Sequence, residues 1–175
     1  MSRLTPAVSD SDHSAGRDDA PVTLVEYGDY ECPHCGRAHP IVREVQRRMG
    51  HRLRLVFRNF PLAEMHPHAV KAAETAEAAA VQGRFWEMHD LLFENQAALE
   101  DSDLIRYARK LALDGERVKE ELAAGAHADR VRQDFRSGVR SGVNGTPTFF
   151  INGARHDGSW DLDALLEVLE RAAKE

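Results

Sequence analysis

The order of strand and helix patterns along the 175-residue chain is the feature that most restricts its fold. Strand-like alternation occurs near the two ends, while every periodic segment from about residue 61 to residue 143 has the spacing of an amphipathic helix. A chain of this length can bury one substantial core, or a small core with a sizeable insertion. The pattern therefore predicts an α/β fold in which a helical block interrupts a mixed sheet.

The first part of the chain is typical of a strand–helix–strand unit. Residues 22–27 (VTLVEY) are β-branched and aromatic, which predicts a short buried strand. The next segment carries apolar residues at helical spacing and ends at Gly50, and Pro40 inside it predicts a bend. Residues 52–60 alternate again as a second strand. Such a βαβ unit places the start of its helix at the carboxyl end of the first strand.

The rest of the chain predicts five helices and then a hairpin with a final helix. The helical segments are marked by residues 70–81, by Phe85 to Leu92, by Leu104 to Leu111, by Val118 and Leu122, and by Val131 to Val139. Residues 148–151 (TFFI) predict a strand, Asn152-Gly153 a hairpin turn and residues 154–156 the return strand. The predicted organisation is a polar arm (1–20), one sheet domain (21–61 and 143–175) and a helical insertion (62–142).

The only two cysteines lie three positions apart in Cys32-Pro33-His34-Cys35, where the first helix is expected to begin. Unpaired N–H groups and the partial positive charge of a helix N-terminus stabilise a thiolate at the first cysteine. Because the thiolate is the attacking species, Cys32 is the predicted nucleophile. Cys35, one turn deeper, would resolve the mixed disulfide.

Three other interpretations of the cysteine pair are weaker. Residues 1–20 contain no apolar leader segment, which predicts a cytoplasmic chain, or a periplasmic one if a leader had been removed, and cytoplasmic proteins rarely keep structural disulfides. A structural zinc site needs four ligands, and only His66 and His68 offer a spare imidazole pair. A proline between the cysteines makes inert core residues less plausible. The sequence predicts redox chemistry without a metal or cofactor.

Two further side chains are candidates for assisting this pair. His34 would place a donor, and when protonated a positive charge, beside Cys32, which would lower the thiol pKa and make the disulfide more oxidising. Glu26 interrupts an apolar strand and is predicted to be partly buried with a raised pKa, as a proton acceptor for Cys35. The alternative for Glu26 is an edge-strand carboxylate in water.

Gly145-Thr146-Pro147 precedes the third predicted strand. A proline at this point indicates a tight turn and a candidate cis peptide bond. If this loop lies beside the cysteines, the backbone of Thr146 can pair with an extended substrate peptide. Thr146 and Pro147 are therefore the predicted substrate-binding residues.

Together these motifs resemble the DsbA-like thioredoxin-fold oxidoreductases over roughly residues 15–172. The resemblance is carried by CPHC at a helix start, Pro40 after it, Glu26 before it and GTPTFF after a helical block. It implies that Cys32 attacks, that Cys35 resolves, that Pro147 is a cis-proline facing them, and that a helical domain is inserted at about residues 62–142. Secreted DsbA has valine where this chain has Thr146, and threonine there resembles more reducing relatives, so the direction of exchange stays open.

The leading functional prediction is disulfide exchange with protein, peptide or small-molecule thiols, with a thiol reductant or a reoxidising protein as a further partner. The alternatives are a thioredoxin-like binding or chaperone module and a redox sensor. A formal net charge of −6 gives no reason to expect nucleic-acid binding, and no run of about eighteen apolar residues predicts membrane insertion. Phosphate-loop, dinucleotide and hydrolase motifs do not occur in the sequence.

Overall fold

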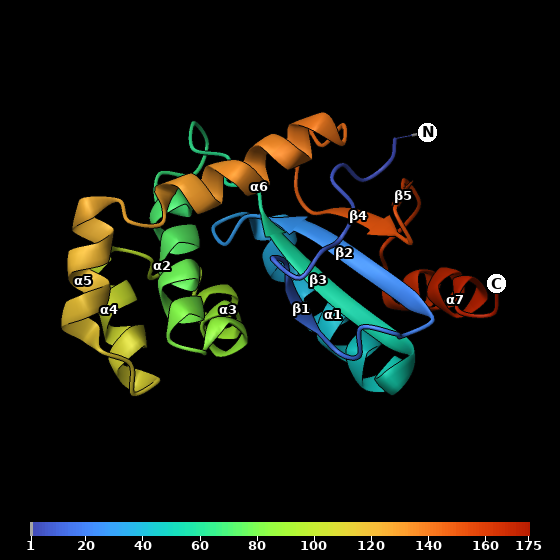
Figure 1. The fold of residues 1–175 in the computed structure, drawn as a ribbon, viewed down its shortest axis with the longest axis horizontal. Coiled ribbons are helices and arrows are strands. Elements are labelled where there is room, and N and C mark those ends of the chain that lie inside the picture. Colours follow the sequence, from blue (N-terminus) through green and yellow to red (C-terminus); the bar gives the residue numbers. More distant parts are fainter. Residues whose placement is uncertain (1) are drawn as a thin grey trace.

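A computed structural model describes residues 2–175, which form a five-stranded mixed sheet and seven α-helices (Figure 1). The elements in chain order are β1 (His13–Ala15), β2 (Val22–Gly28), α1 (Pro33–Met49), a 3₁₀ turn (Gly50–Arg52), β3 (Leu53–Asn59), α2 (Ala69–Val81), α3 (Phe85–Glu94), α4 (Asp101–Lys110), α5 (Gly115–Ala124), α6 (Ala128–Arg140), β4 (Thr148–Ile151), β5 (Ala154–His156) and α7 (Leu162–Ala172). The predicted α/β class is confirmed.

The sheet order is β1-β3-β2-β4-β5. β2 and β3 are parallel, in a register that runs from Val22 opposite Leu53 to Gly28 opposite Asn59. β4 is antiparallel to β2 and forms a hairpin with β5. The hairpin turn uses a positive φ at both Asn152 (49°) and Gly153 (83°), the conformation for which an Asn-Gly pair is suited. From β2 onward, the elements follow one another along the chain as predicted, a βαβ unit, the helical block and then ββα, and their strands share one mixed sheet.

The two faces of the sheet are covered by different parts of the chain. α1 and α7 cover one face, and their core includes Leu24, Val45, Phe149 and Leu165. The other face carries Val25 and Tyr27, and it packs against α6 and the N-terminal arm. Because side chains alternate along β2, Glu26 shares the α1 face with Leu24.

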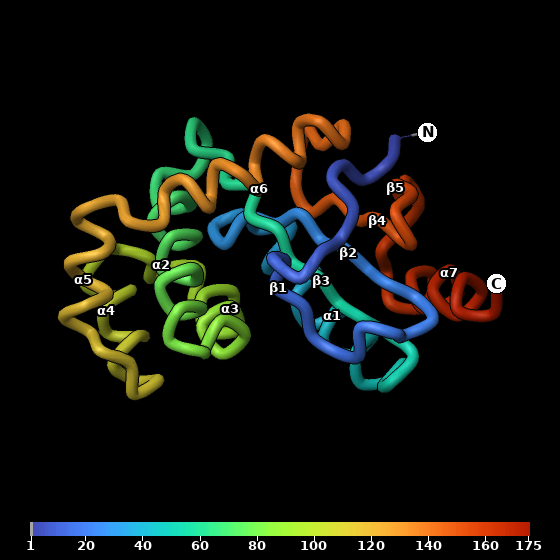
Figure 2. The backbone as a smooth tube through the Cα atoms, viewed as in Figure 1, coloured from blue at the N-terminus to red at the C-terminus, as the bar shows by residue number. Residues whose placement is uncertain are grey.

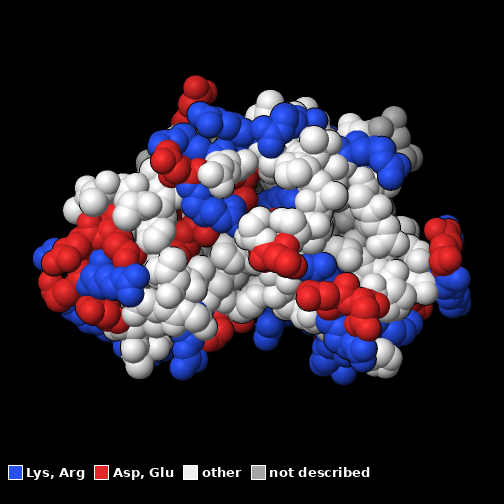
Figure 3. Space-filling model, viewed as in Figure 1, with Lys and Arg blue, Asp and Glu red and all other residues white. Residues whose placement is uncertain are grey.

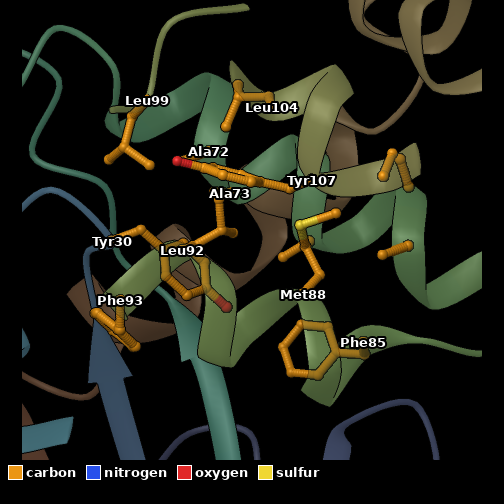
Figure 4. Close-up of a cluster of buried hydrophobic side chains, with 14 of the residues drawn as sticks. Tyr30, Ala72, Ala73, Phe85, Met88, Leu92, Phe93, Leu99, Leu104 and Tyr107 are labelled. Carbon is orange, nitrogen blue, oxygen red and sulfur yellow. The ribbon is translucent and has the colours of Figure 1, made fainter. Parts of the chain in front are cut away.

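Helices α2 to α5 form a block beside the sheet, and α6 runs from this block back across it (Figure 1). The block has its own apolar core, and Tyr30, from the loop before α1, reaches into it beside Leu92 and Phe93 (Figure 4). Gly138 of α6 allows close contact with the sheet, since a Cβ there would lie 2.6 Å from Phe60 and 3.1 Å from Tyr27.

The N-terminal arm differs from the sequence prediction because it contains a strand. β1 pairs antiparallel with β3 and closes that edge of the sheet, and the tube in Figure 2 follows the arm across the sheet before β2 begins. A three-residue strand of small and polar residues is too short to show a periodicity. The strand forms because the backbone groups along the β3 edge need partners.

Charged residues are distributed unevenly over the surface. Arginines follow the upper edge in Figure 3, where α6 carries Arg130, Arg132, Arg136 and Arg140. Acidic residues gather over α4 and α5, at the left of the same view. In the part of the chain that the structure describes, no helix is both long and apolar enough to span a bilayer.

Candidate active site

The two cysteines lie where the chain passes from β2 into α1. Cys32 is the N-cap residue of α1, with extended backbone angles (φ −70°, ψ 121°), and Pro33 occupies the first turn. Proline is suited to this position because its nitrogen has no proton to leave unpaired. The backbone N–H of Gly36 donates to the Cys32 carbonyl at 3.0 Å, so Cys35 is held one turn into the helix. Both thiols are free and buried.

The two thiols have opposite electrostatic environments. Hydrogen bonding with the Cys35 side chain, then with the Thr146 side chain and the backbone N–H groups of Cys35 and His34, lowers the pKa of Cys32 from 9.0 to about 5 in spite of burial. Burial raises the pKa of Cys35 well above its ordinary value, helped by the hydrogen bond with Cys32 and the charge of Glu26. At neutral pH the structure therefore favours a thiolate on Cys32 and a thiol on Cys35.

Glu26 lies beneath the pair on the α1 face of β2. Its side chain is buried, and Oε1 has no hydrogen-bond partner among the described residues. Burial raises the pKa of this carboxyl from 4.5 to about 8. The alternative of an edge-strand glutamate in water is wrong, since β2 is flanked by β3 and β4.

The loop before β4 faces Cys32. The Thr146–Pro147 peptide bond is cis. The Cys32 thiol donates to the Thr146 carbonyl at 3.6 Å, and the Thr148 hydroxyl donates to the Gly145 carbonyl at 2.7 Å, which closes the turn. The structure thus brings together Cys32, Thr146 and Pro147 across more than a hundred residues of sequence. Their roles in substrate binding stay predictions.

His34 is placed differently from the other candidates. Its exposed ring contacts the guanidinium of Arg37, one turn along α1. Its backbone N–H is among the groups that lower the pKa of Cys32. The predicted effect of the imidazole itself on the thiolate stays a prediction.

Gln96 lies at the site although no sequence pattern singles it out. Its side-chain amide comes from the segment after α3 and donates to the carbonyls of Tyr30 (2.9 Å) and Cys32 (2.8 Å). These bonds tie the helical block to the loop that carries Cys32. A glutamine 64 positions from Cys32 leaves no local signal, because only folding brings the two together.

The spare histidine pair of the sequence has structural partners. The His66 ring lies 2.8 Å from Asp29, and the His68 ring lies 2.7 Å from Glu31. Asp29 and Glu31 belong to the loop before Cys32, so these contacts also join the helical block to the cysteine loop. The two imidazoles therefore bind carboxylates of this loop.

Comparison with known proteins places this fold and site in a family. A family model described as thioredoxin matches residues 9–171. The chain belongs to the thioredoxin family. The match covers the cysteine pair, the helical block and the cis-proline loop, and the predicted DsbA-like relationship is confirmed.

Solved structures share this fold. Oxidised BdbD from Bacillus subtilis is 27% identical and covers 94% of each chain, with a TM-score of 0.86. A thioredoxin-like oxidoreductase from Silicibacter pomeroyi is 28% identical and covers 95% of each chain, with a TM-score of 0.83. α-DsbA1 from Wolbachia pipientis is 19% identical over 95% of this chain and 93% of its own, and shows the shared fold with a TM-score of 0.82.

Curated relatives are more similar in sequence but much longer. The Na(+)/H(+) antiporter NhaA 1 of Salinispora arenicola is 50% identical over 169 residues, which is 97% of this chain and 26% of that protein. The chain therefore spans about a quarter of the length of the curated relatives it matches.

Proposed function

We propose that this chain is a thiol–disulfide oxidoreductase that exchanges disulfides with protein or peptide thiols through Cys32 and Cys35. The observation that carries the proposal is the asymmetry of the pair. Cys32, with a pKa lowered to about 5, caps α1 and faces the Thr146 carbonyl, while Cys35 lies buried behind it with a raised pKa. An attacking thiolate and a protonated resolving thiol are what two-step exchange requires.

In the oxidising direction, a substrate thiolate attacks the Cys32 sulfur of the Cys32–Cys35 disulfide. A substrate–Cys32 bond forms, and Cys35 leaves as a thiolate. A second substrate thiolate then attacks the substrate sulfur of this mixed disulfide, and Cys32 leaves as a thiolate. The substrate loses two electrons and gains a disulfide, while the pair gains two electrons. The reverse sequence reduces a substrate disulfide.

Glu26 is suited to move the proton that this reaction needs at Cys35. With a pKa of about 8, its carboxyl is mostly protonated at neutral pH and can protonate the departing Cys35 thiolate. In the reverse direction its carboxylate accepts the proton when the Cys35 thiol attacks. A carboxyl with a pKa near the working pH serves in both directions.

The substrate is proposed to be an extended peptide segment. The backbone of Thr146 lies beside the Cys32 sulfur and offers polar groups that an extended chain can pair with, as an added strand does. A relative 28% identical to this chain is described as a thioredoxin-like oxidoreductase, which supports the same chemistry here.

The decisive experiment compares Cys32→Ser with Cys35→Ser in exchange with a peptide that carries one disulfide. Cys32→Ser should reduce the rate to that of the uncatalysed reaction. Cys35→Ser should instead accumulate a mixed disulfide with the peptide, visible by mass spectrometry, because attack still occurs but resolution does not. Full exchange activity in Cys32→Ser would refute the proposal.

The reduction potential of the Cys32–Cys35 pair, measured against a glutathione buffer, then tells whether the protein oxidises or reduces its substrates. A value close to that of DsbA, about −120 mV, would indicate an oxidase or isomerase. A value close to that of thioredoxin, about −270 mV, would indicate a reductase and would match the threonine at position 146. A stable thiolate at Cys32 favours the first outcome, since it stabilises the reduced form.

The antiporter names of the curated relatives favour a redox sensor as a second candidate. In such a protein the state of the Cys32–Cys35 pair would alter the affinity for a transport partner. The test is binding of the reduced and oxidised chain to the remaining part of a homologous antiporter. Equal affinity in both redox states would remove this candidate and leave the exchange activity unaffected.

A further inference from the structure

Two buried histidines and an aspartate meet where α1 packs against α3. Ring nitrogens of His39 and His89 and a carboxylate oxygen of Asp90 all lie within 4.8 Å of one another. His39 Nε2 and Asp90 Oδ1 are separated by 3.4 Å. Such a convergence of two imidazoles and a carboxylate is typical of a site for a borderline divalent cation.

His39 Nε2 is free to bind a ligand. Its Nε2 atom is buried and has no hydrogen-bond partner among the described residues. Because the side chain is only 8% exposed, water does not readily supply that partner. Both rings are buried, which disfavours their charged form, and the neutral imidazole is the form that binds metals.

The surroundings of His89 and Asp90 are suited to orient them. His89 Nδ1 lies 2.9 Å from the hydroxyl of Tyr30, and this contact fixes the ring. Metal-bound histidines generally have such a partner on the second nitrogen. Asp90 uses Oδ2 for Arg43, 3.6 Å away, so Oδ1 is the oxygen that faces His39.

The cluster borders a surface cleft on the side of His39. His39 lines a cleft of about 630 Å³ together with Gly36, Phe93 and the exposed Glu94. The 3.4 Å between His39 Nε2 and Asp90 Oδ1 is close to the edge of a tetrahedron around Zn²⁺, about 3.3 Å for bonds of roughly 2.0–2.1 Å.

We propose that His39, His89 and Asp90 bind one Zn²⁺ ion between α1 and α3, with water as the remaining ligand. The sequence predicted no metal site and offered only the His66 and His68 pair, which in the structure contacts Asp29 and Glu31. The proposed site uses His39, one helical turn after Cys35, and does not depend on the proposed exchange activity.

The test is a titration of the tag-free, oxidised protein with Zn²⁺ by calorimetry and with Co²⁺ by visible absorption. Oxidation removes the two thiols, which could otherwise bind these metals themselves. The expected result is one ion per chain, with a Co²⁺ spectrum of tetrahedral type and no thiolate-to-metal band. The Cys32→Ser/Cys35→Ser protein should bind equally well, which separates this site from the redox pair. Absence of Zn²⁺ binding by the oxidised protein would overturn the proposal.

Substitutions at the proposed ligands test where the ion binds. His39→Gln and Asp90→Asn should each weaken Zn²⁺ binding at least about tenfold, since even partners behind the ligands contribute roughly 10–100-fold. His51→Gln, at an exposed histidine just beyond the same helix, is the matched control and should bind as the original protein does. Arg43→Gln should bind at least as tightly, because it removes a competing cation from Asp90.

His89→Gln completes the set but changes a fully buried ring, so circular dichroism must first show that it folds. The proposal does not depend on it, because His39 and Asp90 are changed separately. Equal Zn²⁺ affinity in His39→Gln, Asp90→Asn and His51→Gln would show that the ion binds elsewhere, and the proposal would be wrong.

Discussion

At the scale of single residues, three neighbouring groups have pKa values moved away from their ordinary range. That of Cys32 is lowered to about 5, that of Glu26 is raised to about 8 and that of Cys35 is raised. Hydrogen-bond donors around Cys32 favour its charged form, whereas burial disfavours the charged forms of the other two. One negative charge is therefore favoured on the Cys32 sulfur, the group that we propose attacks the substrate.

The first prediction concerns the ionisation of Cys32. In the reduced protein, thiolate absorbance should titrate with a midpoint near pH 5. Because the folded pKa lies below the unfolded value, the thiolate stabilises the reduced protein fully above the unfolded pKa, and this contribution is lost as the pH falls through about 5. Cys32→Ser should abolish the titration. A midpoint near 9 would contradict the prediction.

The second prediction concerns Glu26, whose contribution to stability changes with pH in the opposite direction. Its folded pKa is raised from 4.5 to about 8, so its contribution to stability is present at low pH and is lost as the pH rises from about 4.5 to 8. At about 1.4 kcal/mol per pKa unit, the loss is on the order of 5 kcal/mol. Glu26→Gln should remove this dependence.

The measurement is the free energy of unfolding in urea at pH 5 and pH 9 for both proteins in the same redox state. The difference between Glu26→Gln and the original protein cancels the contribution of Cys32. A difference that does not change between the two pH values would contradict a buried, protonated Glu26.

At the scale of elements, α1 and α6 position the site. α1 presents its N-terminus to Cys32, and α6 connects the helical block to the sheet through a close contact at Gly138. Ser137, beside this glycine, hydrogen bonds to the hydroxyl of Tyr27 at 2.8 Å. Close packing and a buried hydrogen bond together fix where α6 crosses the sheet.

Gly138→Ala should therefore destabilise the protein by about 1–3 kcal/mol, the usual effect of overpacking a core. The added methyl group would lie 2.6 Å from the ring of Phe60, which is buried. Gly115→Ala is the matched control in α5, because its methyl group would meet only the exposed side chain of Arg109, which can move. Urea denaturation compares the two variants. Equal stability would contradict the close contact at Gly138.

At the scale of the whole molecule, the N-terminal arm is part of the fold. The buried guanidinium of Arg58 on β3 binds both carboxylate oxygens of Asp12, at 2.8 and 3.0 Å, and donates to the carbonyls of Pro6 and Ala7. Both side chains are almost fully buried, at 3% and 6% exposure. The arm thus supplies the partners that a buried charge in the sheet requires.

Asp12→Ala should destabilise the protein by about 3–5 kcal/mol, because it leaves a buried arginine without its counterion. Asp10→Ala, at an exposed position of the same arm, should have little effect. Hydrogen bonding with Arg58 lowers the pKa of Asp12 against the effect of burial, so the contribution of the pair should be lost as the pH falls through this lowered pKa. Thermal unfolding of both variants at neutral pH checks the prediction. Similar midpoints would show that the ion pair contributes little.

The local elements were predictable because they depend on residues close in sequence. The β-branched run of β2, the helical spacing of α1 up to Gly50 and the Asn152-Gly153 turn each appear where the sequence predicts them. Helices α2 to α6 appear for the same reason, since each buries an apolar stripe visible in its own sequence. The cysteine pair at a helix start was predictable in the same way.

Contacts between distant segments were decided only by the tertiary structure. The pairing of β1 with β3, the bonds from Gln96 to the cysteine loop, and the meeting of His39 with His89 join residues that have no local pattern in common. Each depends on how helices and strands pack, and packing is set by the sum of many weak contacts across the core. The sequence by itself determined the elements and the position of the cysteine pair at a helix start, while packing determined which side chains surround them.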